Sequence, residues 1–465
     1  MSNSGLKQGV LSSMETLAQS IAGIAPSATP GMLIPIAFGF AGNGTWLSYL
    51  LATIGILFTA QCVNEFTTRS SSAGSLYTFV REGFGHRAGV ITGWGLMFAY
   101  VVCTSCCIVE FALYAISLCK DLLGWAVNAQ SMIALGSALT GYIAYKNIKM
   151  STRLMLSLEL LSVSLILFIV AITLSKHGWA LDPHQVQLSG VHFDNVRMGL
   201  VMAIFGFAAF ETSASLGVEA ASPLQAIPKA VMRSVIFSGT FFVICAYALV
   251  MAFHGNPQSL DKCSTPLLTV CGAIGLPGLG HVVDAGIMVS FFAAGLANLN
   301  AAARAVYQMS RDGVLHKFFG KTHHINFTPH TAVISCVSAS MAIAVILAGC
   351  GFSLLDVVGW LGTLATFGFI YGYMATSVAA GKMLKRVGEL NFVKIVIVVM
   401  SLVVLVSSMI GSLYPVPAYP YNLLPFIFVG YMGFGVIWCF FKVAPPVVAK
   451  SENLPELSAV DLSNG

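Results

Sequence analysis

Three glutamates stand inside long apolar stretches of this 465-residue chain, namely Glu110, Glu159 and Glu211. An ionisable side chain at the centre of an apolar membrane segment costs about 2.5–3.5 kcal/mol on insertion scales. Such residues are usually retained because they meet a cation, hold a proton or support a binding site. The three glutamates are therefore candidates for proton transfer or for pairing with a positively charged group.

The segments that carry these glutamates are those of an all-α integral membrane protein. Hydrophobic residues make up 57% of the chain and charged residues only 9%, so the protein cannot cover its surface with polar groups and its solvent must be lipid. About 20 apolar residues cross the hydrocarbon core of a bilayer. We predict twelve spans, at residues 14–41, 46–66, 88–117, 129–147, 154–174, 197–217, 230–253, 281–309, 331–349, 354–381, 393–412 and 422–441.

The basic residues predict the orientation of these spans. With both termini in the cytoplasm, 19 of the 23 Lys and Arg residues fall on the cytoplasmic side. The other four are Lys120, Lys176, Arg197 and Lys262. Because basic residues are retained on the cytoplasmic side, we expect a multi-pass protein of the plasma or inner membrane with both termini inside.

Two of the twelve spans are interrupted near their centres. The stretch from about Leu11 to Phe40 contains Gly23-Ile24-Ala25-Pro26-Ser27, and the stretch from about Val196 to Gly217 contains Phe205-Gly206-Phe207-Ala208-Ala209-Phe210-Glu211. Unpaired backbone groups are tolerated in a bilayer only where protein or a water-filled cavity satisfies them. Paired interruptions at corresponding places in two halves point to the binding site of a secondary transporter.

The two interruptions expose opposite ends of half-helices. The helix that restarts near Pro26 presents N–H groups, with Ser27 beside them, to an anionic group such as a carboxylate. Carbonyl groups near Ile24 and in the second interruption suit an ammonium group. A simple kink at Pro26 is the alternative. The predicted substrate-binding residues are Ile24, Ala25, Pro26, Ser27, Ala28, Phe205, Gly206, Phe207, Ala208 and Phe210.

Three motifs resemble those of the amino acid–polyamine–organocation permeases. The first is the loop Arg69-Ser70-Ser71-Ser72-Ala73-Gly74-Ser75-Leu76-Tyr77-Thr78-Phe79. The second combines Phe207-Ala208-Ala209-Phe210-Glu211 with Glu219-Ala220, Pro223 and Ile227-Pro228-Lys229-Ala230. The third contains Asn300-Ala301-Ala302-Ala303-Arg304, Tyr307 and Arg311-Asp312-Gly313. The motifs depart from the family pattern at Ala209, where the family has glycine.

This resemblance implies a five-plus-five inverted-repeat fold with helices 1 and 6 broken. Residues 1–174 would form the first repeat and residues 195–385 the second, followed by two peripheral spans at 391–443 and a disordered tail at 444–465. It also implies secondary active transport of amino acids by alternating access. A polyamine or other organic amine permease or exchanger is an alternative, and a channel or transceptor is an alternative of a different class.

The resemblance also implies roles for the glutamates. It places a gating and protonation residue at Glu211, which could instead only accept hydrogen bonds from non-helical backbone. At about the position of Glu159 some relatives carry a lysine that replaces a sodium ion. Here a carboxyl favours proton over sodium coupling, with a structural hydrogen bond or a salt bridge to Arg153 as the alternative. Glu110 lies in the third span, where it could meet a substrate amine, carry a proton, or simply bind a neighbouring helix or water.

Other chemistry has little support in the sequence. The 11 cysteines and 10 histidines show no metal-ligand spacing, and there is no phosphate-binding G-K-[ST] loop or nucleophile motif. We therefore predict no catalytic residues, no metal, no cofactor and no nucleic-acid partner. The expected partners are a small amino acid or amine, protons and the lipid bilayer.

Overall fold

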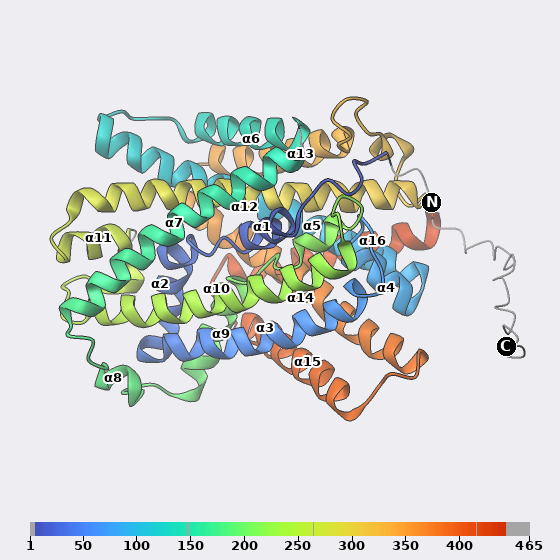
Figure 1. Cartoon of the computed structure of the whole chain (residues 1–465). Coiled ribbons are helices and arrows are strands. Elements are labelled where there is room, and N and C mark those ends of the chain that lie inside the picture. Colours follow the sequence, from blue (N-terminus) through green and yellow to red (C-terminus); the bar gives the residue numbers. More distant parts are fainter. Residues whose placement is uncertain (1–4, 147, 264, 415, 443–465) are drawn as a thin grey trace, which may run out of the picture.

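The computed structural model describes residues 5–146, 148–263, 265–414 and 416–442, and Figure 1 shows a bundle of long helices. Within these residues the only β-type pairing is an isolated bridge between Leu11 and Ala220. The first half of the bundle comprises α1 Ser13–Ile24, α2 Thr29–Ala41, η1 Gly42–Gly44, α3 Thr45–Thr67, α4 Leu76–Phe84, α5 His86–Leu123, α6 Ala129–Lys146, α7 Ile148–Lys176 and α8 Pro183–Val186.

The second half of the described chain begins with a short helix and a turn. These are followed by the longest helices of this half, α12 and α14, and by two C-terminal helices. The elements are α9 Phe193–Phe205, η2 Thr212–Leu216, α10 Pro223–Phe253, η3 Leu260–Lys262, α11 Pro266–Ala273, α12 Pro277–Arg311, η4 Lys317–Gly320, α13 His330–Gly349, α14 Leu354–Arg386, α15 Phe392–Leu413, η5 Tyr421–Leu423 and α16 Leu424–Lys442.

The first break, as we term residues 25–28 between α1 and α2, follows from local backbone chemistry. Ser12 caps the start of α1 through a capping box with Glu15. The helix ends where Ala25 adopts a left-handed conformation, with φ 51° and ψ 62°. Helical hydrogen bonding resumes at α2, whose first turn contains Pro30, a residue with no N–H to leave unpaired there.

The second break, residues 206–211 between α9 and η2, is longer and less regular. Helix α9 stops at Phe205, and the chain continues through turns in which Ala209 has a φ of 64°. The 3-10 helix η2 then leads through another turn to α10. The backbone is thus not α-helical at either segment that the sequence singled out.

Nine segments within the described residues are long and apolar enough to cross a membrane. One of them, Ser13–Thr67, covers the ranges predicted for two spans. Helices α6 and α9 occupy two further predicted ranges but do not meet the same criteria of length and composition. For α9 the physical reason is the second break, which shortens the helix to 13 residues. The predicted tail at 444–465 lies outside the described residues.

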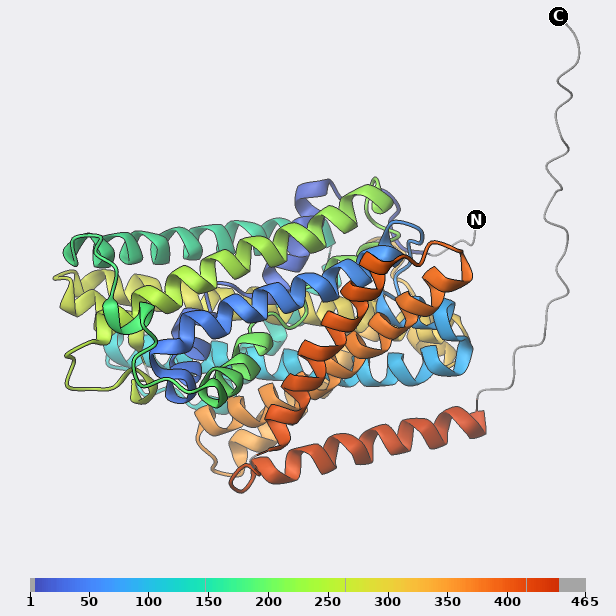
Figure 2. The same ribbon diagram turned by 90° about the horizontal axis from the view of Figure 1, so that it is seen from below.

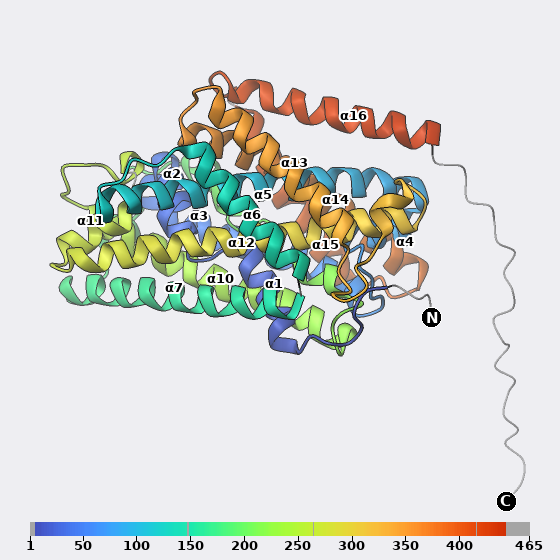
Figure 3. The same ribbon diagram turned by 90° about the horizontal axis from the view of Figure 1, so that it is seen from above.

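Helices α5 and α12 form the centre of the bundle and pack extensively against each other. In the most apolar part of α5, 78% of the residues are buried, against 17% for α15. Figures 2 and 3 show α16 along the edge of the bundle, away from α1 and α7. An apolar face that the bundle leaves exposed on α15 and α16 suits contact with lipid.

Candidate functional site

The last turn of α1, just before the first break, packs directly against the second break. A Cβ atom added to Gly23, near the end of α1, would lie 2.7 Å from the Ala209 carbonyl oxygen and 2.7 Å from Thr212 Oγ1. The Thr212 hydroxyl donates a hydrogen bond to the carbonyl of Gln19 at 3.0 Å. Glycine is therefore required at position 23 because the backbone of the second break approaches α1 so closely.

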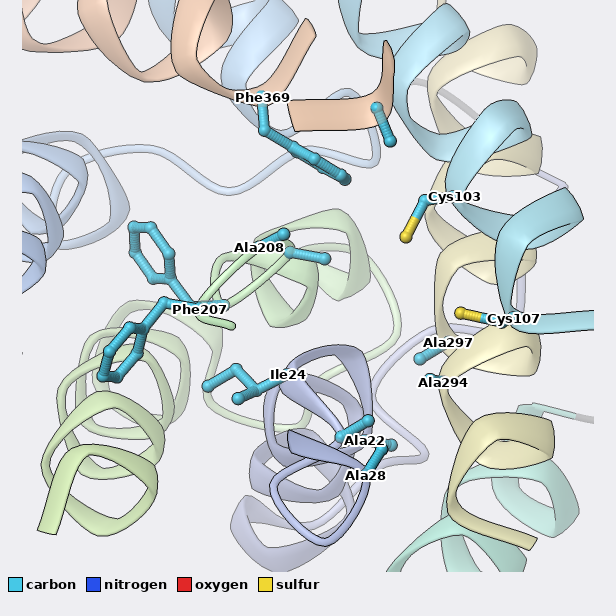
Figure 4. Close-up of a cluster of buried hydrophobic side chains, with 14 of the residues drawn as sticks. Ala22, Ile24, Ala28, Cys103, Cys107, Phe207, Ala208, Ala294, Ala297 and Phe369 are labelled. Atoms are coloured by element: carbon cyan, nitrogen blue, oxygen red, sulfur yellow. The ribbon is translucent and has the colours of Figure 1, made fainter. Parts of the chain in front are cut away.

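Most of the predicted binding residues converge on one region. Figure 4 shows Ile24 and Ala28 near Phe207 and Ala208, with side chains from α5, α12 and α14 around them. All ten predicted residues are buried except Phe205, which is partly exposed. The facing residues that Figure 4 labels on the three other helices are Cys103, Cys107, Ala294, Ala297 and Phe369.

Glu159 of α7 joins the first break to α12. Its Oε1 accepts hydrogen bonds from the backbone N–H of Ser27 at 2.8 Å and from the Ser27 hydroxyl at 2.9 Å. Its Oε2 accepts one from the Ser290 hydroxyl at 2.6 Å. Glu159 is 1% exposed to solvent, and all three hydrogen-bond donors are neutral. This arrangement accommodates a buried carboxyl group without a basic partner.

Two sequence-based expectations about this region change. The possible salt bridge between Arg153 and Glu159 is wrong, because Arg153 pairs with Glu15 at 2.6 Å. The prediction that Ser27 offers donors to a substrate carboxylate also needs correction. Both the N–H and the hydroxyl of Ser27 already bind Glu159, so the chain itself occupies the anion position at the start of α2.

Glu211 ends the second break and binds two tyrosines from distant helices. Its Oε1 accepts a hydrogen bond from the Tyr100 hydroxyl of α5, and its Oε2 accepts one from the Tyr373 hydroxyl of α14, both at 2.6 Å. The Tyr373 hydroxyl in turn accepts the N–H of Ala209 at 2.9 Å. All of these side chains are fully buried. Glu211 therefore fastens three separate elements at one point.

The sequence analysis missed Tyr100 and Tyr373. Tyrosine is common in membrane helices, so residue type alone does not mark either position. Tyr373 lies one turn from Phe369, with ring centroids 6.0 Å apart, and its ring centroid is 5.0 Å from that of Phe210. The aromatic wall of the second break is therefore built from α14 as well as from the break itself.

Glu110 of α5 lies near the region of the breaks but has fewer partners than the other two glutamates. It is 5% exposed, and the Cys106 sulfur on the preceding turn lies within hydrogen-bonding range of its carboxyl group. Within the described part of the chain, Glu110 forms no ion pair.

A buried ion pair lies beyond the second break, towards the α4 end of the bundle. Arg304 Nε and Nη2 donate to the two carboxylate oxygens of Glu219 at 2.6 and 2.7 Å. The Arg304 Nη1 also donates to the Asn300 carbonyl at 2.9 Å. The side chains are 1% and 0% exposed. Such a bidentate, fully desolvated pair links α12 to the turn between η2 and α10. Removing one partner would leave a buried charge unpaired.

A surface cavity of about 300 Å³ lies apart from both breaks, where α3 meets α14 and α15. Its lining includes Glu65, Arg69 and Lys394. Glu65 forms salt bridges with Arg69 at 2.7 Å and with Lys394 at 3.4 Å. Nearby, hydrogen bonds from Lys394 and the charge of Arg69 hold the pKa of Glu389 below its usual value. In the described residues, no cluster of three His, Cys, Asp or Glu side chains could hold a metal ion.

Comparison with known proteins identifies the family of the chain. A sequence profile of the amino acid permease family matches residues 16–414. The chain belongs to the amino acid permease family. The members of this family to which the chain is similar are permeases rather than enzymes. The nine apolar segments of the described residues fit a multi-pass membrane protein.

Individual relatives are distant. The branched-chain amino acid permease BcaP of Bacillus subtilis (strain 168) is 25% identical over 312 residues, covering 63% of this chain and 65% of that protein. BcaP of Lactococcus lactis subsp. cremoris (strain MG1363) is 26% identical, covering 76% and 77%. The low-affinity putrescine importer PlaP of Escherichia coli (strain K12) is 24% identical, covering 64% and 66%. The chain thus spans just under two thirds of the length of the Bacillus protein.

A solved structure shares the fold. The crystal structure of MhsT in complex with L-phenylalanine superposes with a TM-score of 0.59 at 14% identity, covering 87% of this chain and 98% of that chain. At this identity the similarity concerns the fold alone.

Proposed function

We propose that the protein is a secondary active transporter that moves amino acids or related amines across the cytoplasmic membrane by alternating access. In this proposal spans 1–5 and 6–10 form two inverted repeats, at residues 1–174 and 195–385, with both termini in the cytoplasm. The two peripheral spans at 391–443 complete a count of twelve. The observation that carries the proposal is the close contact of Gly23, at the end of α1 just before the first break, with the second break, in a member of the amino acid permease family.

The proposed substrate site lies between the breaks. Non-helical backbone at residues 25–28 and 206–208 supplies polar groups inside an otherwise apolar core, where few other polar groups are available. Ile24, Phe207 and Ala208 supply apolar contacts around them. A ligand with an ammonium group matches this combination better than a purely apolar ligand. It can donate hydrogen bonds to backbone carbonyls of the breaks, whose N–H groups already have partners within the protein.

Two sets of contacts are the proposed gates. Glu211 with Tyr100 and Tyr373 holds the second break against α5 and α14, and the Arg304–Glu219 pair closes the predicted cytoplasmic side. Opening towards the cytoplasm would separate these contacts. A change in the charge of Glu211 would alter the balance between the outward and inward states, because each state offers the carboxyl group different partners.

The proposed coupling ion is a proton at Glu159. This carboxyl group connects the first break with α12 through Ser27 and Ser290. Protonation would weaken the hydrogen bonds that it accepts, since charge-assisted hydrogen bonds are roughly twice as strong as neutral ones. The proton could therefore release α2 from α7 at one stage of the transport cycle.

Reconstitution in proteoliposomes tests the proposed function. Purified protein should take up a radiolabelled substrate from a panel of neutral amino acids, basic amino acids and diamines. A carrier gives saturable uptake that unlabelled substrate on the opposite side accelerates. Flux that rises linearly with concentration and shows no counterflow would indicate a channel, and binding without flux would indicate a transceptor.

A further inference from the structure

Four acidic side chains in the core of the bundle lack a basic partner. Glu110, Glu159, Glu211 and Asp284 are each at most 5% exposed, and none forms an ion pair with a described Lys or Arg. A buried carboxylate without a partner is unfavourable unless neutral donors or a cation compensate it. The question is what compensates each of the four.

These four residues fall into two pairs. Glu159 and Glu211 are satisfied by neutral donors, three from serine and two from tyrosine. Glu110 and Asp284 are not. Asp284 Oδ1 is buried and has no hydrogen-bond partner among the described residues. The described donor in hydrogen-bonding range of Glu110 is the Cys106 thiol, which is a weak donor. Glu110 and Asp284 thus retain capacity for a further donor.

Glu110 lies on the face of α5 that meets the breaks. Cys103, Cys107, Glu110 and Tyr114 follow one another at spacings of four, three and four residues, which places them on one side of a helix. Figure 4 shows Cys103 and Cys107 on this side, facing the region of Ile24 and the breaks. Glu110 comes three residues after Cys107, about 4.5 Å further along the helix axis.

Asp284 extends this face across the contact between α5 and α12. The Tyr114 hydroxyl, which donates to the Gly31 carbonyl at 3.3 Å, interacts electrostatically with both Glu110 and Asp284. Asp284 interacts in the same way with Asp121, an exposed residue near the end of α5. The carboxyl groups of Asp121, Asp284 and Glu110 therefore form a series from the exposed end of α5 towards the breaks.

At the start of α2, the predicted anion position, Ser27 has no free donor in the described structure. The donors of Ser27 at the start of α2 bind Glu159, so this position is already occupied by an acidic group of the chain. The two carboxyl groups with spare acceptor capacity lie on the α5 side. A ligand with a net positive charge would complement this arrangement better than a neutral zwitterion.

We propose that Glu110 binds the terminal ammonium group of an elongated cationic substrate whose other end lies between the breaks, and that Asp284 and Asp121 attract this cation along α5. The substrate class is a linear diamine or a diamino acid. This inference rests on the proposed function as an amino acid or amine carrier and assigns the substrate class of the same site.

Uptake by proteoliposomes that contain the full chain tests this inference. The probes are putrescine, L-lysine and L-leucine. The wild type should transport at least one of the two cations with a lower KM than leucine. Glu110→Gln should raise the KM for that cation about tenfold or more, because a hydrogen bond between charged groups contributes about 1.5–3 kcal/mol and 1.4 kcal/mol corresponds to tenfold. Any uptake of leucine should change less than twofold.

Three further variants sharpen the test. Asp284→Asn should raise the KM for the cation less than Glu110→Gln does, and Glu110→Asp should retain the preference for cations even if Glu110→Gln folds poorly. Asp194→Asn is the matched control, since it removes an exposed carboxylate from α9 without touching α5, and it should leave every KM unchanged.

Several results would overturn the assignment. If the wild type transports leucine and neither cation competes, the substrate is neutral and Glu110 has another role, although the carrier function stands. Equal loss of cation and leucine uptake in both Glu110 variants would make Glu110 a structural residue. Absence of any flux in the wild type would instead contradict the proposed function itself.

Discussion

A buried glutamate lies at each of the two breaks, but the hydrogen-bond donors of the two glutamates differ. At the first break, Glu159 binds a backbone N–H and two serine hydroxyls at short range and stabilises the start of α2. At the second break, Glu211 binds tyrosine hydroxyls from α5 and α14. The first arrangement fixes a helix end, whereas the second ties a buried turn to two other helices. We therefore expect Glu159 to govern energy coupling and Glu211 to govern conformational exchange.

The largest expected effect is at Glu159. Glu159→Gln removes the titratable group but keeps an amide oxygen that can accept hydrogen bonds from Ser27. Accumulation of substrate driven by a pH gradient should be abolished, while exchange of internal for external substrate continues. Radiolabelled uptake with and without an imposed gradient measures both activities. Sodium-dependent accumulation that survives a proton uncoupler would reverse the assignment.

A smaller effect is expected at Glu211. Glu211→Gln should flatten the pH dependence of transport and lower turnover about tenfold, with less change in binding affinity, because charge-assisted hydrogen bonds to two tyrosines weaken. Initial rates across a series of pH values give the profile. Tyr100→Phe removes one of these hydrogen bonds and should have a weaker effect in the same direction. A wild-type pH profile in Glu211→Gln would leave Glu211 as a structural acceptor only.

The contact between α1 and the second break predicts a loss of stability. Gly23→Ala places a methyl group 2.7 Å from the Ala209 carbonyl oxygen, which forces the end of α1 away from the second break. We expect a loss of about 1–3 kcal/mol in the free energy of unfolding, the usual range for overpacking. Thermal unfolding followed by fluorescence measures this, with Gly430→Ala as the control, because an added Cβ there meets no atom within 4 Å. Equal stability of the two variants would argue against the close contact.

The smallest expected effect concerns the backbone of the second break. Ala209 occupies a left-handed conformation that costs about 1–2 kcal/mol for an L-residue, and glycine avoids this cost but loses more entropy on folding. Ala209→Gly should therefore raise stability by about 0.5 kcal/mol. Ala208→Gly, which has no positive φ to relieve, should lower it. A loss of stability in both variants would mean that the Ala209 methyl group contributes packing that outweighs the strain.

The sequence predicted these breaks because their causes are local. Pro26 and Pro30 lack an N–H, and the second interruption contains the small residues Gly206, Ala208 and Ala209. Each interruption was therefore visible in a short window. The partners of the glutamates were not. Tyr100 and Tyr373 are 111 and 162 residues away from Glu211, and a single sequence carries no signal for such a pairing.

Closeness in the sequence did not predict the ion-pair partner of Arg153 near Glu159. Arg153 is six residues before Glu159 on the same helix, and six residues correspond to about 240° of rotation, so the two side chains point in different directions. Arg153 instead meets Glu15 on α1. The spacing of Glu110 from Cys103 and Cys107 places it on the same side of α5 as these two residues. Helical register therefore predicts which face a residue occupies, while the helix that packs there follows from the fold.

The most direct test of the account is a cryo-electron microscopy map of the full chain in lipid nanodiscs with the compound that the uptake assay shows to be transported. The account predicts ligand density between residues 25–28 of the first break and residues 206–208 of the second, in contact with backbone atoms of both. Density at another position, such as the cavity lined by Glu65, Arg69 and Lys394, with the region between the breaks filled by side chains, would contradict it.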